Sequence, residues 1–360
     1  MKPSTFSARP RASGDPELAG SSQARLDSRL RGNERMRRRA FITLLGGAAT
    51  WPLVARAQRA ANVPEVGFLY TGSASALPSR IAALAEGLRS KGYVEGRNLA
   101  LVTRSAELRA DQFEPLVAEL VQRNVRVLFA AGPVVVRHAR AATASIPIVA
   151  LDLESDPVKS GLVNSIARPG GNLTGLFFDF PEFSAKWLQL LIEAVPHLSR
   201  LAVLWDPTTA PVQLDTVSAE AKRRGLSLQV LQVQAPGEFE AAFSAASSGR
   251  ADGLLILSSP LFGSNPKRLA DLAAQHRLPA ISLFPEFAQS GGLLAYGTNL
   301  IDLYIQAGAL IGKVLDGAKP EDLPVERPSR FHLVINLKTA KALGLDVPSN
   351  MLALTDEVIE

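Results

Sequence analysis

The sequence predicts an α/β protein of two lobes, in which a hinge of three chain segments joins two helix-covered parallel sheets. Three observations lead to this prediction. Continuous runs of Val, Ile and Leu recur along the chain, helix-period apolar stripes lie between them, and the rhythm is interrupted once before it restarts. Alternating strands and helices form right-handed βαβ units, whose strands lie parallel in one sheet.

The predicted strands are apolar throughout, a pattern typical of strands covered on both faces. They occupy residues 66–70, 125–132, 146–152, 201–206, 253–259 and 279–284. Two helical stripes between them consist of Phe113, Leu116, Val117, Leu120 and Val121, and of Trp187, Leu190, Leu191, Ala194 and Val195. Stripes of this period predict amphipathic helices that cover the sheets.

The interruption follows the strand at 146–152. A Pro-Gly-Gly-Asn turn at 169–172 precedes a short strand at 173–178, and the rhythm restarts at Phe183. This pattern predicts a crossover between two Rossmann-like lobes. We expect further crossings near 295–300 and 320–327.

The crossings divide the chain into two expected lobes. Lobe 1 is expected to contain residues 63–177 and 298–322, and lobe 2 residues 178–297 and 323–360. Lobes joined by several short segments move about a hinge rather than as one rigid pair.

Residues 36–57 have the order of a cleavable signal peptide. An arginine cluster at 37–39 precedes an apolar run at 40–54 and an Ala-Arg-Ala end at 55–57. A membrane-spanning helix needs roughly 20 apolar residues, and this run is shorter. An amphipathic first helix is the alternative. Arginines 38 and 39 fit the twin-arginine route or the general secretory route, and either leads to the periplasm.

Residues 1–35 are rich in Arg, Ser, Gly and Pro and have no apolar period. We expect them to be disordered. Met36 stands immediately before the arginines, so this stretch is either a misannotated leader ahead of the true start or a long basic region.

The excess of basic residues lies in residues 1–57. The whole sequence has a net charge of +5, with 39 basic and 34 acidic residues. Residues 1–57 hold 11 of the basic and four of the acidic side chains, so the remainder has 28 and 30, a net charge of −2. No basic patch survives cleavage, and we expect no nucleic-acid partner. The chain has no cysteine, which excludes thiol nucleophiles, thiolate metal sites and disulfides.

No catalytic motif is present in the sequence. The four histidines, at positions 138, 197, 276 and 332, have no metal-ligand spacing. There is no G-x-S-x-G elbow, no Walker loop and no G-x-G-x-x-G after the first strand. We therefore expect no enzyme activity, no cofactor and no metal.

Ligands of open parallel sheets bind beyond the carboxyl ends of the strands. We expect a small organic ligand with an apolar body and polar ends, bound between the lobes. The candidate ligand-binding residues at these ends are Tyr70, Ser73, Gly132, Asp152, Trp205, Asp206, Ser258 and Phe284. Tyr70 and Trp205 can instead cap the apolar core, and Ser73 and Ser258 can simply cap helices.

Several stretches resemble the ABC transporter substrate-binding family associated with tryptophan and tyrosine transport. They are GYVEGRN (92–98), SDPVKSGLVNSIARPGGNLTG (155–175), GGLLAYGTNLIDLY (291–304), FHLVINLKTAKALGL (331–345) and the tail LALTDEVIE. The resemblance covers essentially the whole mature chain. It implies the type I periplasmic binding protein fold, with ligand captured between two closing lobes and delivered to a membrane permease.

The resemblance also implies ligand contacts. It places them at Ser73, Gly132, Asp152, Asp206, Ser258, Glu286, Tyr296, Asn299 and Asp302. Asp302 can instead cap the helix that follows Asn299. Relatives often read Asn-Pro-Asn at 206–208, where this chain reads Asp-Pro-Thr, and some read Thr-Asp-Asn at 258–260, where it reads Ser-Ser-Pro. In amino-acid binders a carboxylate from the second lobe commonly meets the ligand ammonium, and the resemblance offers Asp206, Glu286 or Asp302 for this role.

The expected function is that of an exported solute-binding protein of an ABC importer. Its expected ligand is an amino acid, such as an aromatic one, or an aromatic or small carboxylate. Its expected partners are an inner-membrane ABC permease with its ATPase, and a monomer is expected. The alternatives are a ligand-sensing module for a membrane receptor and an exported enzyme.

Overall fold

The computed structural model describes residues 63–178, 180–328 and 330–360. The expected leader at 1–35 and signal peptide at 36–57 lie outside the described residues. Within these described ranges, no helix is both long and apolar enough to cross a bilayer.

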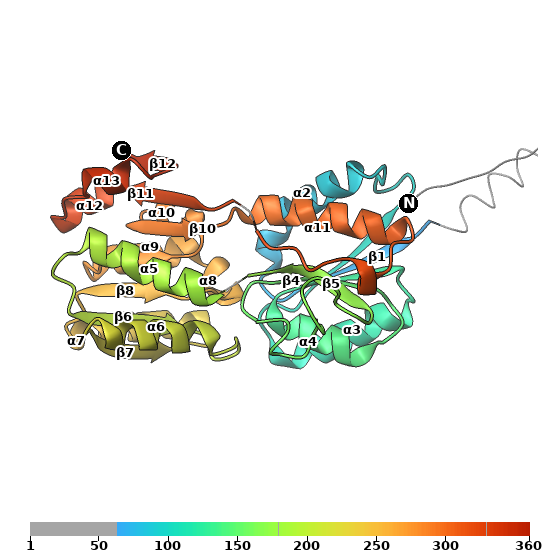
Figure 1. Ribbon diagram of the computed structural model, residues 1–360, viewed down its shortest axis with the longest axis horizontal. Coiled ribbons are helices and arrows are strands. Elements are labelled where there is room, and N and C mark those ends of the chain that lie inside the picture. The colour runs from blue at the N-terminus through green and yellow to red at the C-terminus, as the bar shows by residue number, and fades with distance from the viewer. Residues whose placement is uncertain (1–62, 179, 329) are drawn as a thin grey trace, which may run out of the picture. The chain divides into compact units, whose positions relative to one another are not determined.

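The first lobe is built on a sheet of five parallel strands in the order β2-β1-β3-β4-β5. Figure 1 labels β1, β4 and β5 of this sheet. The strands are β1 (Glu65–Tyr70), β2 (Ala100–Ser105), β3 (Val127–Ala131), β4 (Ile148–Asp152) and β5 (Leu173–Phe177). Tyr70 pairs with Ala131 and Asp152 with Phe177, so the carboxyl ends of these strands meet at one edge.

Helices cover both faces of this sheet. They are η1 (Ala74–Ala76), α2 (Leu77–Arg89), η2 (Ala110–Gln112), α3 (Phe113–Gln122), α4 (Pro133–Ala142) and α11 (Leu300–Leu315). Successive residues of β1 point to opposite sides: Phe68 packs with α2 and α11, and Leu69 packs with α3 and α4. A Cβ at Gly87 of α2 would lie 1.9 Å from the Ile305 carbonyl oxygen of α11, so these two helices approach closely.

The second lobe has a sheet of seven strands in the order β12-β11-β10-β9-β8-β6-β7. They are β6 (Arg200–Trp205), β7 (Ser227–Gln232), β8 (Gly253–Ile256), β9 (Ala280–Ser282), β10 (Leu294–Gly297), β11 (His332–Asn336) and β12 (Glu357–Ile359). All neighbours are parallel except β10 and β11.

The antiparallel pair departs from the predicted all-parallel sheet for a topological reason. The chain leaves the second lobe after β10, forms α11 in the first lobe and returns into β11. It re-enters at the end of the sheet from which it left, so β11 runs opposite to β10. The two-lobed α/β fold with three crossings is otherwise as predicted.

The helices of the second lobe lie on both faces of its sheet (Figure 1). They are α5 (Phe180–Ala194), α6 (Val212–Arg223), η3 (Pro236–Glu238), α7 (Phe239–Ser248), α8 (Pro260–Gly263), α9 (Pro266–Gln275), α10 (Pro285–Gln289), α12 (Leu337–Leu343) and α13 (Ser349–Leu352). Helices α7 and α9 share a buried cluster around Phe243 and Leu269, while Trp187 of α5 belongs to the cluster on the opposite face.

The last crossing lies against the first lobe. After η4 (Pro320–Asp322), the Glu326 amide donates to the Gly175 carbonyl, the Phe177 amide donates to the Glu326 carbonyl, and the Thr174 hydroxyl donates to the Leu323 carbonyl. The lobe boundaries remain a prediction. These contacts favour a boundary after Glu326 rather than at 322.

Candidate ligand-binding site

A small cavity lies where the carboxyl ends of both sheets meet. Its volume is about 40 Å³. The first lobe contributes Tyr70, Arg80, Gly132, Glu154 and Tyr304 to its wall, and the second lobe contributes Pro260 and Phe284. The cavity therefore has aromatic walls and two ionisable groups of opposite sign.

Arg80 is a buried cation without an acidic partner. It lies in the first turn of α2, is 7% exposed, and takes part in none of the ion pairs among the described residues. Its guanidinium stacks on the Tyr70 ring, 4.4 Å from the centroid, and its Nη1 has no hydrogen-bond partner. A buried guanidinium is costly unless paired, which makes Arg80 a candidate anion-binding group.

Two buried carboxyl groups lie close together beyond the end of β4. The Asp152 Oδ1 accepts hydrogen bonds from the amides of Glu154 and Ser155, both at 3.0 Å, while its Oδ2 has no partner. Burial raises the pKa of Asp152. Burial, with the nearby Asp152 and Asp206 charges, raises the pKa of Glu154 to about 8. A cationic neighbour would stabilise the ionised form of both carboxyl groups.

The two lobes contact each other directly at this cavity. The Ser258 hydroxyl of the second lobe donates to the Glu154 Oε1 of the first at 2.6 Å, and both residues are buried. The Tyr70 and Ser264 hydroxyls are hydrogen-bonded at 3.2 Å, and the Arg137 guanidinium donates to the Thr208 carbonyl. The contact between the lobes thus involves the cavity-lining residues themselves.

A second cavity of about 60 Å³ adjoins the first. It shares Pro260 with the first cavity, and the two meet at the consecutive residues Gly132 and Pro133. Apolar side chains form most of its wall, namely Leu108, Phe113, Val134 and Leu261, and its polar groups include Thr71, Asp206 and Thr208. Charged and aromatic groups thus line the first cavity, and mostly apolar groups line the second.

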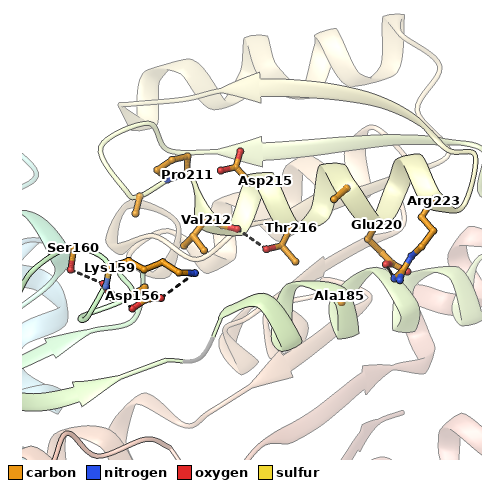
Figure 2. A pocket seen from close by; sticks show the side chains of 12 residues that line it. Asp156, Lys159, Ser160, Ala185, Pro211, Val212, Asp215, Thr216, Glu220 and Arg223 are labelled. Atoms are coloured by element: carbon orange, nitrogen blue, oxygen red, sulfur yellow. Dashed lines mark hydrogen bonds and ion pairs between the residues drawn. The ribbon is translucent and has the colours of Figure 1, made fainter. Parts of the chain in front are cut away.

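A larger, more open groove of about 860 Å³ lies beside α6 (Figure 2). Lys159 pairs with Asp156, and Arg223 pairs with Glu220, so its cations are already neutralised. Unlike the two cavities, it presents no buried polar atom without a partner among the residues that the structure describes. The smaller cavities are therefore the stronger candidate for a ligand site.

The structure brings most of the strand-end candidates together. Tyr70, Gly132 and Phe284 line the first cavity, Asp206 lines the second, and Asp152 and Ser258 lie against Glu154. Gly132 has φ +112°, and a Cβ there would lie 2.2 Å from the Thr71 hydroxyl oxygen. Glycine is therefore required at the point where the cavities meet.

The other candidates lie outside both cavity linings. Ser73 caps η1 and Asn299 caps α11 through their side-chain oxygens. Asp302 lies in the first turn of α11. Trp205 and Glu286 each have one buried polar atom without a partner.

Tyr296 belongs to an aromatic cluster at the crossings. Its ring lies 6.3 Å from that of Phe183 and 6.1 Å from that of Phe331, and its carbonyl accepts from the Trp187 indole. These rings come from segments next to all three crossings. The cluster therefore ties the hinge segments together at the second lobe.

Four candidate residues of the cavities were not predicted from the sequence: Arg80, Glu154, Thr71 and Tyr304. Glu154 and Thr71 each follow closely after a predicted strand, so the strand-end rule could have included them. Arg80 and Tyr304 lie inside helices, where an arginine and a tyrosine give no sequence signal of burial.

Among the described residues, no group of three or more His, Cys, Asp or Glu side chains is placed to hold a metal ion. The residues at the cavities instead offer one buried cation, several carboxyl groups, hydroxyls and aromatic rings. This set suits reversible binding of a charged organic molecule.

Several known proteins are similar to this chain in sequence or in fold. The chain is 26% identical over 260 residues to a tyrosine-binding protein of Clostridioides difficile (strain R20291), covering 72% of this chain and 74% of the relative. An ABC domain from Streptococcus pneumonia in complex with L-Trp has the same fold, with a TM-score of 0.75 and 22% identity over 83% of this chain and all of that one. A conserved domain protein of Vibrio cholerae has a TM-score of 0.76 and 24% identity over 82% of this chain and all of its own. A family model matches residues 66–359, and the chain belongs to the ABC transporter substrate binding protein family.

Proposed function

We propose that this protein is the exported receptor of an ABC importer, and that it captures an α-amino acid between its lobes and delivers it to the permease. The choice of an amino acid as the ligand rests on one observation. The first cavity has an unpaired buried guanidinium, Arg80, and a buried carboxyl, Glu154, in the same wall. A zwitterion neutralises both, with its carboxylate at Arg80 and its ammonium at Glu154 and Asp152.

The walls and the relatives support an aromatic amino acid. Tyr70, Phe284 and Tyr304 line the charged cavity, and Phe113 lines the adjoining one. One relative is named a tyrosine-binding protein, and one structural neighbour holds L-Trp. Aromatic carboxylates remain the second candidate, because Arg80 alone can hold a carboxylate.

Delivery would follow from lobe closure. A ligand shifts the balance between separated and closed lobes only through its higher affinity for one of them. A ligand that contacts both lobes at one cavity has a higher affinity for the closed lobes, which provides this difference in affinity. The partner is the permease with its ATPase, the location is the periplasm, and the working state is a monomer. A receptor that passes the same closure to a sensor kinase is the alternative, and genomic neighbours distinguish the two.

Thermal unfolding of residues 58–360 tests the ligand class. The panel contains L-tyrosine, L-tryptophan, L-phenylalanine and L-leucine, with 3-phenylpropionate lacking the amine and phenethylamine lacking the carboxylate. A ligand at 100 times its dissociation constant stabilises the fold by about 2.7 kcal/mol. We expect shifts with amino acids and little or none with the two truncated compounds. An equal shift with 3-phenylpropionate would support the carboxylate alternative, and no shift with any amino acid would contradict the proposal.

A further inference from the structure

The second cavity contains a buried hydroxyl that has no hydrogen-bond partner. The Thr71 Oγ1 is inaccessible to solvent, and the residue is 4% exposed. Its backbone is fixed, because its amide donates to the Ala131 carbonyl and its carbonyl accepts from the Leu108 amide. A buried hydroxyl without a hydrogen-bond partner costs free energy. The Thr71 hydroxyl lies beside Gly132, at the point where the cavities meet.

Asp206 lines the same cavity and has an unused hydrogen-bond acceptor position. Its Oδ1 accepts from the Thr208 amide at 2.9 Å and from the Thr208 hydroxyl at 2.7 Å. Its Oδ2 accepts from the Ser259 hydroxyl at 2.5 Å. A carboxylate offers about four acceptor positions, so roughly one remains, on Oδ2. Asp206 is 4% exposed, so water has little access to that position.

Besides Thr71 and Asp206, the polar residues Thr208 and Gln234 line this cavity, and the rest of its wall is apolar. Leu108, Phe113, Val134 and Leu261 are the side chains that a ring would contact. Neither cavity holds a whole aromatic amino acid, since 40 and 60 Å³ correspond to roughly three and five water molecules. An aromatic amino acid with its charged end at Arg80 and Glu154 would therefore have to extend past Gly132 toward the second cavity.

We propose that the second cavity is a side-chain subsite that selects a ring bearing a hydroxyl group, with Thr71 and Asp206 as the selecting residues. This inference rests on the proposed amino-acid function. A hydroxyl is both donor and acceptor: it donates to Asp206 and accepts from Thr71. An unsubstituted phenyl ring leaves both groups unpaired, and an indole N–H can donate to Asp206 but cannot accept from Thr71.

The test compares L-tyrosine with L-phenylalanine by calorimetric titration of the mature wild-type chain and two variants. Thr71→Val removes the hydroxyl at nearly constant volume, and Thr71→Ser keeps it. In the wild type we expect tyrosine to bind at least about tenfold more tightly than phenylalanine. In Thr71→Val, tyrosine affinity should fall about tenfold while phenylalanine affinity stays within about threefold, and Thr71→Ser should retain the preference.

The possible outcomes separate this inference from the proposed function. Equal binding of both amino acids by the wild type, or an unchanged preference in Thr71→Val, overturns the hydroxyl subsite and leaves amino-acid capture intact. Failure to bind either amino acid overturns the subsite, and failure to bind any amino acid of the thermal-unfolding panel contradicts the proposed function as well. Thr71→Val should unfold at the wild-type temperature or above without ligand, because it removes an unpaired buried hydroxyl. That measurement separates loss of selectivity from loss of fold.

Discussion

Glu154 in the first lobe accepts a hydrogen bond from Ser258 in the second, with 2.6 Å between Oε1 and Oγ. Glu154 is 2% exposed and Ser258 is fully buried. The same carboxyl group lines the cavity that contains Arg80. A ligand ammonium at Glu154 would therefore act on the contact between the lobes as well as on the ligand site.

Replacing Ser258 should weaken the contact between the lobes. Ser258→Ala removes the donor to Glu154 and leaves a buried acceptor unpaired, at a cost of about 1–3 kcal/mol. We expect a larger radius of gyration without ligand, measured by small-angle X-ray scattering. Ser79→Ala is the control, because Ser79 lies on an exposed turn of α2 and donates only to the Ala76 carbonyl. Equal radii for both variants would count against a role for this hydrogen bond.

The raised pKa of Glu154 predicts a pH dependence of stability. The pKa is about 8 in the folded protein against 4.5 for the free side chain. Between these values the folded state binds a proton that the unfolded state has lost. Stability of the ligand-free protein should therefore fall as pH rises from about 4.5 to 8 and then level off. Thermal unfolding across this range should show a shallower fall in Glu154→Gln.

The same pKa predicts proton release on ligand binding. A ligand ammonium favours the ionised carboxylate, so at pH 7 binding should release up to about one proton per ligand. Titration calorimetry in buffers of different ionisation enthalpy measures that number. The Asp152 charge raises the pKa of Glu154, so the two carboxyl groups titrate as a pair. Binding with no buffer dependence would show that the ammonium does not approach these carboxyls.

Most of the fold could be predicted from apolar runs, because central strands are covered on both faces. The strands at β1, β3, β4, β6 and β8 are buried along nearly their whole length. The edge strands β2 and β7 lack continuous apolar runs and were not predicted. Every residue of β2 is half-buried, and β7 has exposed and half-buried positions with one buried residue, Leu231. The antiparallel β11 depends on the path of the chain through the other lobe, which no local pattern encodes.

The site could be predicted only in part. The strand-end rule located Tyr70, Gly132 and Asp206, because parallel strands place their carboxyl ends at one edge. It could not locate Arg80, which is separated from the strand ends in sequence and reaches the cavity because α2 packs against α11. Side chains supplied by helix packing require the tertiary structure.

Gly132 should tolerate no larger residue. Gly132→Ala places a side chain at φ +112°, costing about 1–3 kcal/mol, and brings its Cβ to 2.2 Å from the Thr71 hydroxyl oxygen. We expect a lower melting temperature together with weaker ligand binding. Gly237→Ala is the matched control, since nothing lies within 4 Å of a Cβ there and its φ is not positive. Equal stability of the two variants would show that the junction between the cavities can relax.

Arg80 should contribute to binding and little to folding. Arg80→Met keeps the length and apolar stem of the side chain but removes a buried charge that lacks an acidic partner. Replacing such a buried ion with an apolar group of similar size is often neutral or stabilising. The ligand-free variant should therefore unfold at or above the wild-type temperature.

Amino-acid binding by Arg80→Met should weaken by roughly ten- to hundredfold, because charged hydrogen bonds contribute about 1.5–3 kcal/mol. Arg89→Met, at the exposed end of the same helix, is the control and should bind as the wild type does. Titration calorimetry with L-tyrosine and tyramine separates the two ends of the ligand. If Arg80 holds the carboxylate, the variant loses most of its preference for tyrosine over tyramine. A preference that survives the substitution would place the carboxylate elsewhere in the cleft.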